Sequence, residues 1–382
     1  MISRRTFLKR MMASGASLTS ASLLFEAIRS AWPREALAAG PRILPPIEAE
    51  YYTKKPGGMV QCGLCPRQEE LGRGEMGICR SRTNTNGRLM TYASGQPCVI
   101  NVDPIEKNPL AHVLPGTKTF AIAHAGCNVI CKYCQNWQFS QKSPFETKNL
   151  EFNESDAFRL AKEKDMPSIT FTYTEGSSHI EFNKKLARSA RGRGFKAFLA
   201  TNGYVRERPL ADFLEVLDGV TVTIKGFTNS FYKDYIGVRD FKPVLDSCEQ
   251  IRKAGVWLEI ATLIVPAAND SDKEIGDIAA WIADRLGPDT PWHIERFAPM
   301  FKLANLQPTE VKTLERARET GFKKGLKYVY LSNLAPHEGN HTFCPKCKKP
   351  VIKRLGFKVL SNDLRNGQCP HCRTRLPGVW GA

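Results

Sequence analysis

Long apolar runs are missing from this 382-residue chain: no stretch approaches the roughly 18 consecutive apolar residues that a membrane-spanning helix needs. A transmembrane span is therefore not expected. Internal repeats and low-complexity tracts are missing too, and the composition is that of a globular protein. At this length the chain can bury a sizeable core and hold one large domain with appendages, or about two to three ordinary ones.

Acidic residues are comparatively few, 38 against 55 Lys and Arg, which gives a formal net charge of +17. Metal-bound thiolates carry negative charge that this count omits, so each zinc with four cysteines would remove two positive charges. The basic excess continues in residues 341–382, with nine Lys or Arg against one Asp. No aromatic-and-basic stacking pattern accompanies it, so we expect a solvated or anion-facing surface, with a nucleic-acid site as the weaker alternative.

The twelve cysteines are many for such a chain, and they cluster at close spacings. Clustering at C-x-x-C spacing favours metal ligation over disulfides. The groups are Cys62, Cys65, Cys79 and Cys98; Cys127, Cys131 and Cys134; and Cys344, Cys347, Cys369 and Cys372. Cys248 stands alone in a helical pattern, where we expect an ordinary buried residue.

The N-terminus has the pattern of a twin-arginine export signal over residues 1–40. Arg4 and Arg5 in "SRRTFLK" precede a weakly apolar stretch, and "ALA" at 36–38 offers a small-residue cleavage site. Because this route exports folded proteins, the signal predicts cofactor assembly in the cytoplasm followed by export to the periplasm. The alternative is a basic amphipathic helix, since Glu26 interrupts the apolar stretch.

Short apolar runs alternate with amphipathic helical patterns between about residues 117 and 331. The runs are "TFAIAH", "SITFTY", "FKAFLATN", "GVTVTIKG", "WLEIATLIV", "WHIERF" and "KYVYLS". In the best helical pattern Ser271 and Glu274 form a capping box. The alternation predicts an α/β fold with a parallel sheet, either doubly wound or a full or partial β/α barrel. A Cys/Gly-rich module (41–116) precedes it, and a separate small module (341–382) follows.

The loop "CNVICKYCQNWQFSQ" comes directly after the first apolar run, at the carboxyl end of a strand, where α/β sheets gather their chemistry. Gly126 would let the backbone turn sharply into it. Its three cysteines are one short of the four that a structural zinc or an electron-transfer cluster takes. Three thiolates on a 4Fe-4S cluster leave one iron free to bind something else. A zinc knuckle that borrows a fourth ligand is the alternative.

The spacing C-x-x-x-C-x-x-C, with the aromatic Tyr133 before the last cysteine, resembles the radical S-adenosylmethionine (radical SAM) superfamily. Over nearly all of residues 59–380 the chain resembles the radical SAM member of the AmmeMemoRadiSam group, which is similar to pyruvate formate-lyase activating enzymes. The resemblance rests jointly on "NVDPIEKNPLAHVLPGT", "GCNVICKYCQNWQFSQ", "YTEG", "TNGY", "IKGF", "VPAANDS", "PWHIERFAP" and "GLKYVYLSN". In that superfamily the open iron binds the amino and carboxylate groups of S-adenosylmethionine (SAM), and one electron cleaves SAM to a deoxyadenosyl radical.

This resemblance implies a partial (β/α) barrel over 117–331 and an oxidoreductase that abstracts hydrogen from a substrate. It also implies a reductant such as flavodoxin or ferredoxin, and a protein or peptide substrate from the same gene group. Cofactor-binding roles are implied for Tyr133, Glu175, Asn202 and Lys225. Glu175 would accept hydrogen bonds from the SAM ammonium, and Lys225 would meet its carboxylate; a surface acid and a solvated lysine are the alternatives.

Some positions depart from the family pattern. Thr223 stands where the family has an Asp, Ala298 lies near a position where it has a His, and Glu69 stands where it has a fourth N-terminal cysteine. His293 and Arg296 alternate on a late strand and are candidates for the barrel mouth, although a lone His in an apolar run is more often a satisfied core group.

The flanking cysteines predict two further metal sites. Two C-x-x-C pairs in the tail have zinc-ribbon spacing, so four thiolates would close a tetrahedron around a structural zinc, with a rubredoxin-like iron as the alternative. In the N-terminal module Cys62, Cys65 and Cys79 lack a fourth partner. We expect Cys98 to complete a zinc or auxiliary-cluster site; Glu69 as the ligand, or loss of the metal, are the alternatives.

Two further function classes stay open. A non-catalytic electron carrier or interaction protein would hold fully ligated metal centres, and an RNA-modifying radical enzyme would use the basic tail to bind RNA. The substrate and its catalytic residues cannot be read from the sequence, because fold and cofactor do not name a target.

Overall fold

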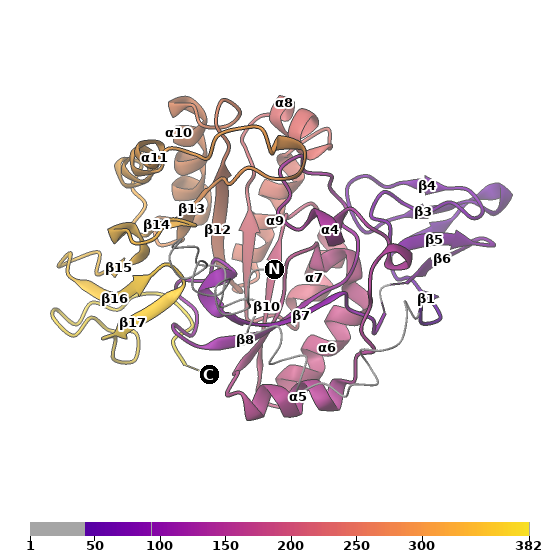
Figure 1. Cartoon of the computed structure of the whole chain (residues 1–382), viewed down its shortest axis with the longest axis horizontal. Helices are drawn as coiled ribbons and strands as arrows, with labels where there is room; N and C mark the ends of the chain where they lie inside the picture. Colours follow the sequence, from indigo (N-terminus) through magenta and orange to yellow (C-terminus); the bar gives the residue numbers. More distant parts are fainter. Residues whose placement is uncertain (1–42, 93, 382) are drawn as a thin grey trace, which may run out of the picture. The chain divides into compact units, whose positions relative to one another are not determined.

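An eight-stranded sheet forms the centre of the computed structural model, which describes residues 43–92 and 94–381. Its strand order is β14-β13-β12-β11-β10-β9-β8-β7 (Figure 1). Strands β8 to β14 pair in parallel, and β7 pairs antiparallel with β8 at one edge. The strands are β7 Val99–Pro104, β8 Lys118–Ala123, β9 Ser168–Phe171, β10 Lys196–Thr201, β11 Gly219–Thr223, β12 Trp257–Ile264, β13 Trp292–Arg296 and β14 Val329–Ser332.

Each of the seven apolar runs that the sequence presents forms one of the parallel strands. Strands covered on both faces are buried along nearly their whole length, as in β9, where every residue is buried. In β8 and β10 the sequence accordingly shows continuous apolar stretches and not the alternation of a half-exposed strand. The sheet is open, because β14 and β7 are its unpaired edges.

Amphipathic helices connect the strands and pack against them with their apolar faces. The longer ones are α5 Glu154–Glu163, α6 Ile180–Gly192, α7 Glu207–Leu214, α9 Lys242–Lys253, α10 Asp272–Trp281 and α11 Val311–Lys323. Two short ones, α4 Trp137–Ser140 and α8 Asn229–Phe231, lie in loops after β8 and β11. The order of strands and helices is that of the expected α/β partial barrel.

The predicted capping box of α10 is formed only in part. The Ser271 side chain accepts a hydrogen bond from the backbone N–H of Glu274, as expected of an N-cap. The Glu274 carboxylate does not reach back to Ser271. It accepts instead from the backbone N–H of Phe227, at 2.6 Å, and so ties α10 to the loop after β11.

The N-terminal module holds two small antiparallel sheets of three strands, in the orders β1-β6-β5 and β2-β3-β4. Their short strands are β1 Ile47–Glu48, β2 Tyr52–Lys54, β3 Val60–Cys62, β4 Glu70–Leu71, β5 Arg82–Thr85 and β6 Arg88–Thr91. A buried ion pair joins this module to the barrel: the Arg82 guanidinium and the Glu181 carboxylate on α6 are 2.7 Å apart.

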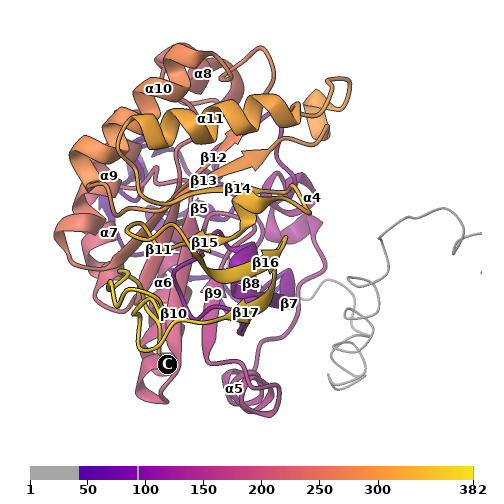
Figure 2. The same ribbon diagram turned by 90° about the vertical axis from the view of Figure 1, so that its left-hand side faces the viewer.

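The C-terminal module is a three-stranded antiparallel sheet of β15 Thr342–Phe343, β16 Pro350–Leu355 and β17 Lys358–Asn362. It lies beside β14 in both views (Figures 1 and 2). The module shares a hydrophobic core with the barrel: Tyr328 and Tyr330 belong to the same buried cluster as Val351 and Ile352. It is therefore docked on the barrel and not merely tethered to it.

Among the described residues no helix is long and apolar enough to cross a membrane. The predicted twin-arginine signal, residues 1–40, lies outside the described residues.

Candidate active site

A cavity of about 390 Å³ opens at the carboxyl ends of the parallel strands. Each strand from β9 to β13 contributes to its wall at or just beyond its last residues, as expected for the active face of a β/α barrel. The residues predicted from sequence that line it are Cys127, Cys131, Tyr133, Cys134, Glu175, Asn202 and Lys225. The structure thus brings all seven to one cavity.

The cysteine loop enters this cavity through a left-handed turn. Gly126 follows β8 with φ of +100°, and a Cβ added there would lie 2.1 Å from the backbone oxygen of Cys79. Only glycine satisfies both the backbone angle and the close approach. The sequence-based reason for a glycine here is confirmed, and the contact with the N-terminal module adds a second reason.

Burial sets the electrostatics of two of the three thiols, those of Cys127 and Cys131. Desolvation raises the pKa of Cys127 well above its ordinary value, and it raises the pKa of Cys131 to about 11, with the Lys225 charge acting in the opposite direction. Free thiolates would therefore be costly here, so a positively charged metal centre is the natural counter-charge. Among the described residues only a different cysteine group brings its ligand atoms within 4.8 Å of one another. The three thiols of the loop are not part of such a closed group.

Glu175 is a buried and fully oriented carboxylate, 1% exposed, and not a surface acid. Its Oε1 accepts hydrogen bonds from the Ser177 N–H and the Thr201 hydroxyl, and its Oε2 accepts from the Asn202 N–H at 2.7 Å. A carboxylate offers about four acceptor positions, so one remains for a ligand in the cavity.

Asn202 links Glu175 to the cysteine loop. Its side-chain amide donates to the Asn128 side chain at 2.8 Å and approaches the Cys127 sulfur at 3.8 Å. Asn128 in turn donates to the Tyr204 carbonyl. Sequence reasoning missed Asn128; its position between two of the cysteines was the available signal.

Lys225 and Tyr133 complete the predicted set. The Lys225 backbone is fixed on both sides, by the Tyr232 hydroxyl and by the Asn269 side chain, and its side chain lines the cavity. Tyr133 is buried, and within the described residues its hydroxyl has no hydrogen-bond partner.

His293 lies in the core and not at the barrel mouth. Its Nε2 contacts the buried Glu259 carboxylate at 2.7 Å, and its ring stacks on Tyr330. Arg296 donates to the Thr309 carbonyl. Of the two readings, the satisfied core group holds for His293.

Glu295, which sequence reasoning missed, does line the cavity. Burial raises the pKa of its carboxyl, and the charges of His293 and Lys225 partly offset that effect. The signal was available, because a residue two positions after His293 on a strand points to the same face.

The model of the radical SAM superfamily matches residues 122–282, which include the cysteine loop and the strand ends that line the cavity. An uncharacterized protein of Methanocaldococcus jannaschii is 37% identical over 331 residues, covering 86% of this chain and 98% of that relative. The chain belongs to the radical SAM superfamily.

Other comparisons are more distant. A candidate glycyl-radical enzyme activating enzyme of the same organism is 25% identical over 232 residues, covering 57% of this chain and 88% of that protein. A radical SAM methyltransferase from Sphaerobacter thermophilus has a TM-score of 0.46 at 12% identity, covering 81% of this chain and 84% of that one. A domain of pyruvate-formate lyase-activating enzyme from Bacteroides vulgatus has a TM-score of 0.38 at 15% identity, covering 43% and 98%.

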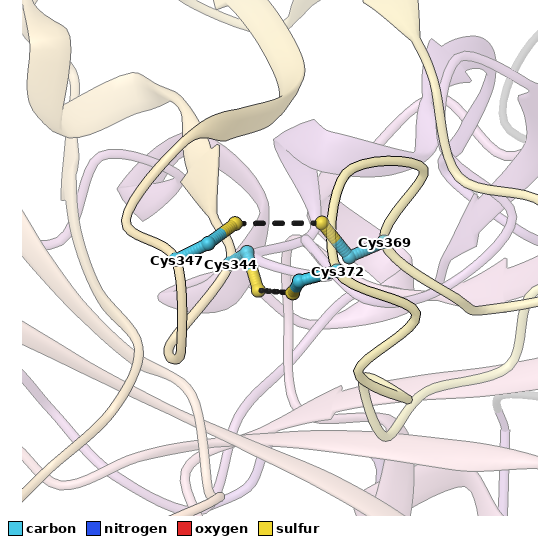
Figure 3. A group of neighbouring side chains, drawn as sticks. All are labelled: Cys344, Cys347, Cys369 and Cys372. Atoms are coloured by element: carbon cyan, nitrogen blue, oxygen red, sulfur yellow. Dashed lines mark hydrogen bonds between the residues drawn. The ribbon is translucent and has the colours of Figure 1, made fainter.

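The C-terminal cysteines of this radical SAM protein form one tight group, in which all four sulfurs lie within 4.8 Å of one another (Figure 3). The sulfurs of Cys344 and Cys372 are 3.5 Å apart, and those of Cys347 and Cys369 are 3.6 Å apart. Four sulfurs at about 2.3 Å from one tetrahedral ion would be ~3.8 Å apart. The group therefore fits a single metal ion, as the zinc-ribbon spacing predicts.

The N-terminal cysteines are arranged differently. Cys62, Cys65 and Cys79 are buried, and the pKa of Cys62 and of Cys65 is raised mainly by desolvation, with smaller effects of Cys79 and Glu69. Cys98 takes no part in this group: its thiol donates to the Ala123 carbonyl, at 3.6 Å. Glu69 lies near this group, and its carboxylate accepts a hydrogen bond from the Ile78 N–H at 3.0 Å.

This N-terminal group packs against the cysteine loop. Arg67, two residues after Cys65, donates to the Asn128 carbonyl at 2.9 Å and to the Gly237 carbonyl at 2.5 Å. Together with the Cys79 contact at Gly126, these bonds brace the cysteine loop from outside the barrel.

Proposed function

We propose that this protein uses a site-differentiated 4Fe-4S cluster on Cys127, Cys131 and Cys134 to cleave SAM reductively. When bound, the cluster would supply the electron that converts SAM to methionine and a deoxyadenosyl radical, which abstracts hydrogen from the substrate. The observation that carries this proposal is that three thiols, an oriented carboxylate, an amide and a lysine line one cavity at the strand ends.

The chain's own residues would hold and orient SAM. The remaining acceptor position of Glu175 suits the methionine ammonium, and the Lys225 ammonium suits the methionine carboxylate. Asn202 fixes the position of the Glu175 carboxylate relative to the cysteine loop, because its backbone N–H bonds to Glu175 and its side chain bonds to Asn128 in the loop. The cavity walls exclude water, which protects a radical from side reactions.

For the substrate we propose a protein or peptide. Support comes from the relative named as a candidate glycyl-radical enzyme activating enzyme, since such an enzyme acts on a protein. The partner would belong to the same AmmeMemoRadiSam group, and the electron would come from a flavodoxin or ferredoxin.

We also propose a structural zinc ion at Cys344, Cys347, Cys369 and Cys372. A closed set of four thiolates leaves no open coordination position, which is typical of structural sites. The short sulfur separations argue for one ion and against a multi-iron cluster at this site. For the N-terminal group we propose a second metal site on Cys62, Cys65 and Cys79, with Glu69 as its fourth ligand.

The test is anaerobic reconstitution of the full chain with iron and sulfide, followed by a SAM cleavage assay with dithionite. We expect methionine and deoxyadenosine from the native protein and none from Cys131→Ala. Cys248→Ala is the matched control, because Cys248 is a buried cysteine of α9 that does not line the cavity. Unchanged cleavage by Cys131→Ala would refute the proposal.

A further inference from the structure

The barrel has a side opening, because its sheet ends at β14 on one edge and at β7 on the other. The C-terminal module contacts β14 and the segment between β7 and β8. On the β14 side, the Tyr330 hydroxyl bonds to Thr342 Oγ1 at 2.9 Å, and Asn340 donates to the Leu331 carbonyl at 2.7 Å.

On the other side the module contacts the segment between β7 and β8. The Arg354 guanidinium, from β16, donates to the Ala111 carbonyl at 2.8 Å and lies 3.5 Å from the Glu106 carboxylate. Both side chains are less than 5% exposed. Backbone bonds between Val379 and both His112 and Leu114 continue this contact.

Separating this buried ion pair is costly, because removing either partner leaves an unpaired charge in the interior. The pair therefore holds the module against the barrel. The module is thus fixed to β14 and to the segment that links β7 and β8. Figure 2 shows its strands β15 to β17 below β14 and in front of β8.

The turn between β16 and β17 reaches the active-site cavity. Phe357, at this turn, and Asn333, just after β14, line the same cavity as the three cluster cysteines. Lys107 and Pro109, from the β7–β8 segment, line it as well. Asn333, the β7–β8 segment and the tip of the C-terminal module thus form part of the cavity wall.

We propose that the C-terminal cysteine module is the side wall of the active site, and that Phe357 is the residue that limits which substrate group fits beside SAM. This inference rests on the proposed function. A volume of about 390 Å³ is near the lower end of the ~300–1,000 Å³ that pockets for drug-sized ligands span. Phe357 narrows the part of this cavity that a substrate group would occupy.

The test compares Phe357→Ala with Leu360→Ala in the reconstituted full chain. Leu360 lies three residues further on, in β17, is 58% exposed and does not line the cavity, so it is a matched control. The readout is the rate at which the reduced protein loses iron to the bulky chelator bathophenanthroline disulfonate. We expect Phe357→Ala to release iron about fivefold faster than the native protein, because water and chelator gain access to the cluster.

Zinc content and thermal midpoint, measured on the same samples, should be equal in the two variants, which separates an opened wall from a misfolded module. Equal iron release from Phe357→Ala and Leu360→Ala would overturn the proposal.

A second readout does not need the cluster: in protein without iron, N-ethylmaleimide should label Cys134 faster in Phe357→Ala, and equal labelling would likewise overturn it. Failure of the native protein to hold a cluster would instead refute the proposed function.

Discussion

At the scale of single residues, the orientation of each polar side chain in the site depends on the hydrogen bonds that its neighbours make to it. Glu175 accepts three hydrogen bonds from neighbours that lie on or next to the ends of β9 and β10. The "YTEG" segment indicated the residue, but the sequence could not show that Ser177 and Thr201 orient it. Glu295 and Asn128 were missed for a related reason, since their roles arise from neighbours that only the fold brings together.

Glu175→Gln should weaken SAM binding by about tenfold to a hundredfold, because an amide replaces a charged acceptor worth about 1.5–3 kcal/mol. Titration of the reconstituted protein with SAM measures this affinity. Glu207→Gln, on the exposed first turn of α7, is the control and should bind SAM normally. An unchanged affinity in Glu175→Gln would remove Glu175 from the SAM site.

Glu295 gives a pH-dependent prediction. Burial raises the pKa of its carboxyl above the ordinary value, so folding favours the protonated form, and stability falls as pH rises between the unfolded and the folded pKa. Glu295→Gln removes this cost. Its thermal midpoint should exceed that of the native protein at pH 8.5, and the difference should shrink as the pH falls to the ordinary Glu pKa of about 4.3. A difference that is the same at pH 8.5 and at about pH 4 would contradict the assignment.

At the scale of elements, the parallel strands could be predicted and the small sheets could not. Buried strands such as β8 and β10 appear in the sequence as continuous apolar runs. Strands of two to four residues in the N-terminal module carry no such pattern. The partners of Cys62 and Cys65 were hard to choose for the same reason, because their neighbours depend on how short irregular segments fold.

Gly126→Ala tests how the N-terminal module braces the cysteine loop. The substitution forces an L residue into left-handed backbone, at about 1–2 kcal/mol, and drives its Cβ into the Cys79 carbonyl. We expect lower stability and loss of cluster iron on gel filtration.

Gly194→Ala is the matched control, because Gly194 has φ of +83° and open space around it. It should cost only the backbone strain and leave the iron content unchanged. Normal iron retention in Gly126→Ala would show that the close approach to Cys79 does not support the loop.

At the scale of the whole molecule, the chain has three cysteine groups: one in the N-terminal module, one in the loop after β8 and one in the C-terminal module. The arrangement of the sulfurs differs between them. The C-terminal spacing predicted a closed site, and the structure places its sulfurs at single-ion distances. The docking of that module on the β7–β8 segment had no sequence signal, because Arg354 and Glu106 are 248 positions apart in the chain.

The export signal leads to a prediction for the whole protein. The "SRRTFLK" pattern predicts export of the folded chain, and replacement of both arginines, Arg4→Lys and Arg5→Lys, should retain it in the cytoplasm. Cell fractionation followed by immunoblotting measures the distribution. A native chain found full-length in the cytoplasm, with the double variant distributed identically, would contradict the export proposal.

The most direct test of the central claim is electron paramagnetic resonance of the reduced cluster with and without SAM. A cluster held by three cysteines has an open iron, so SAM should bind it and shift the spectrum of the native protein. The electron-carrier alternative predicts a fully ligated cluster whose spectrum does not respond. A clear shift on adding SAM supports the account, and an unchanged spectrum at saturating SAM would contradict it.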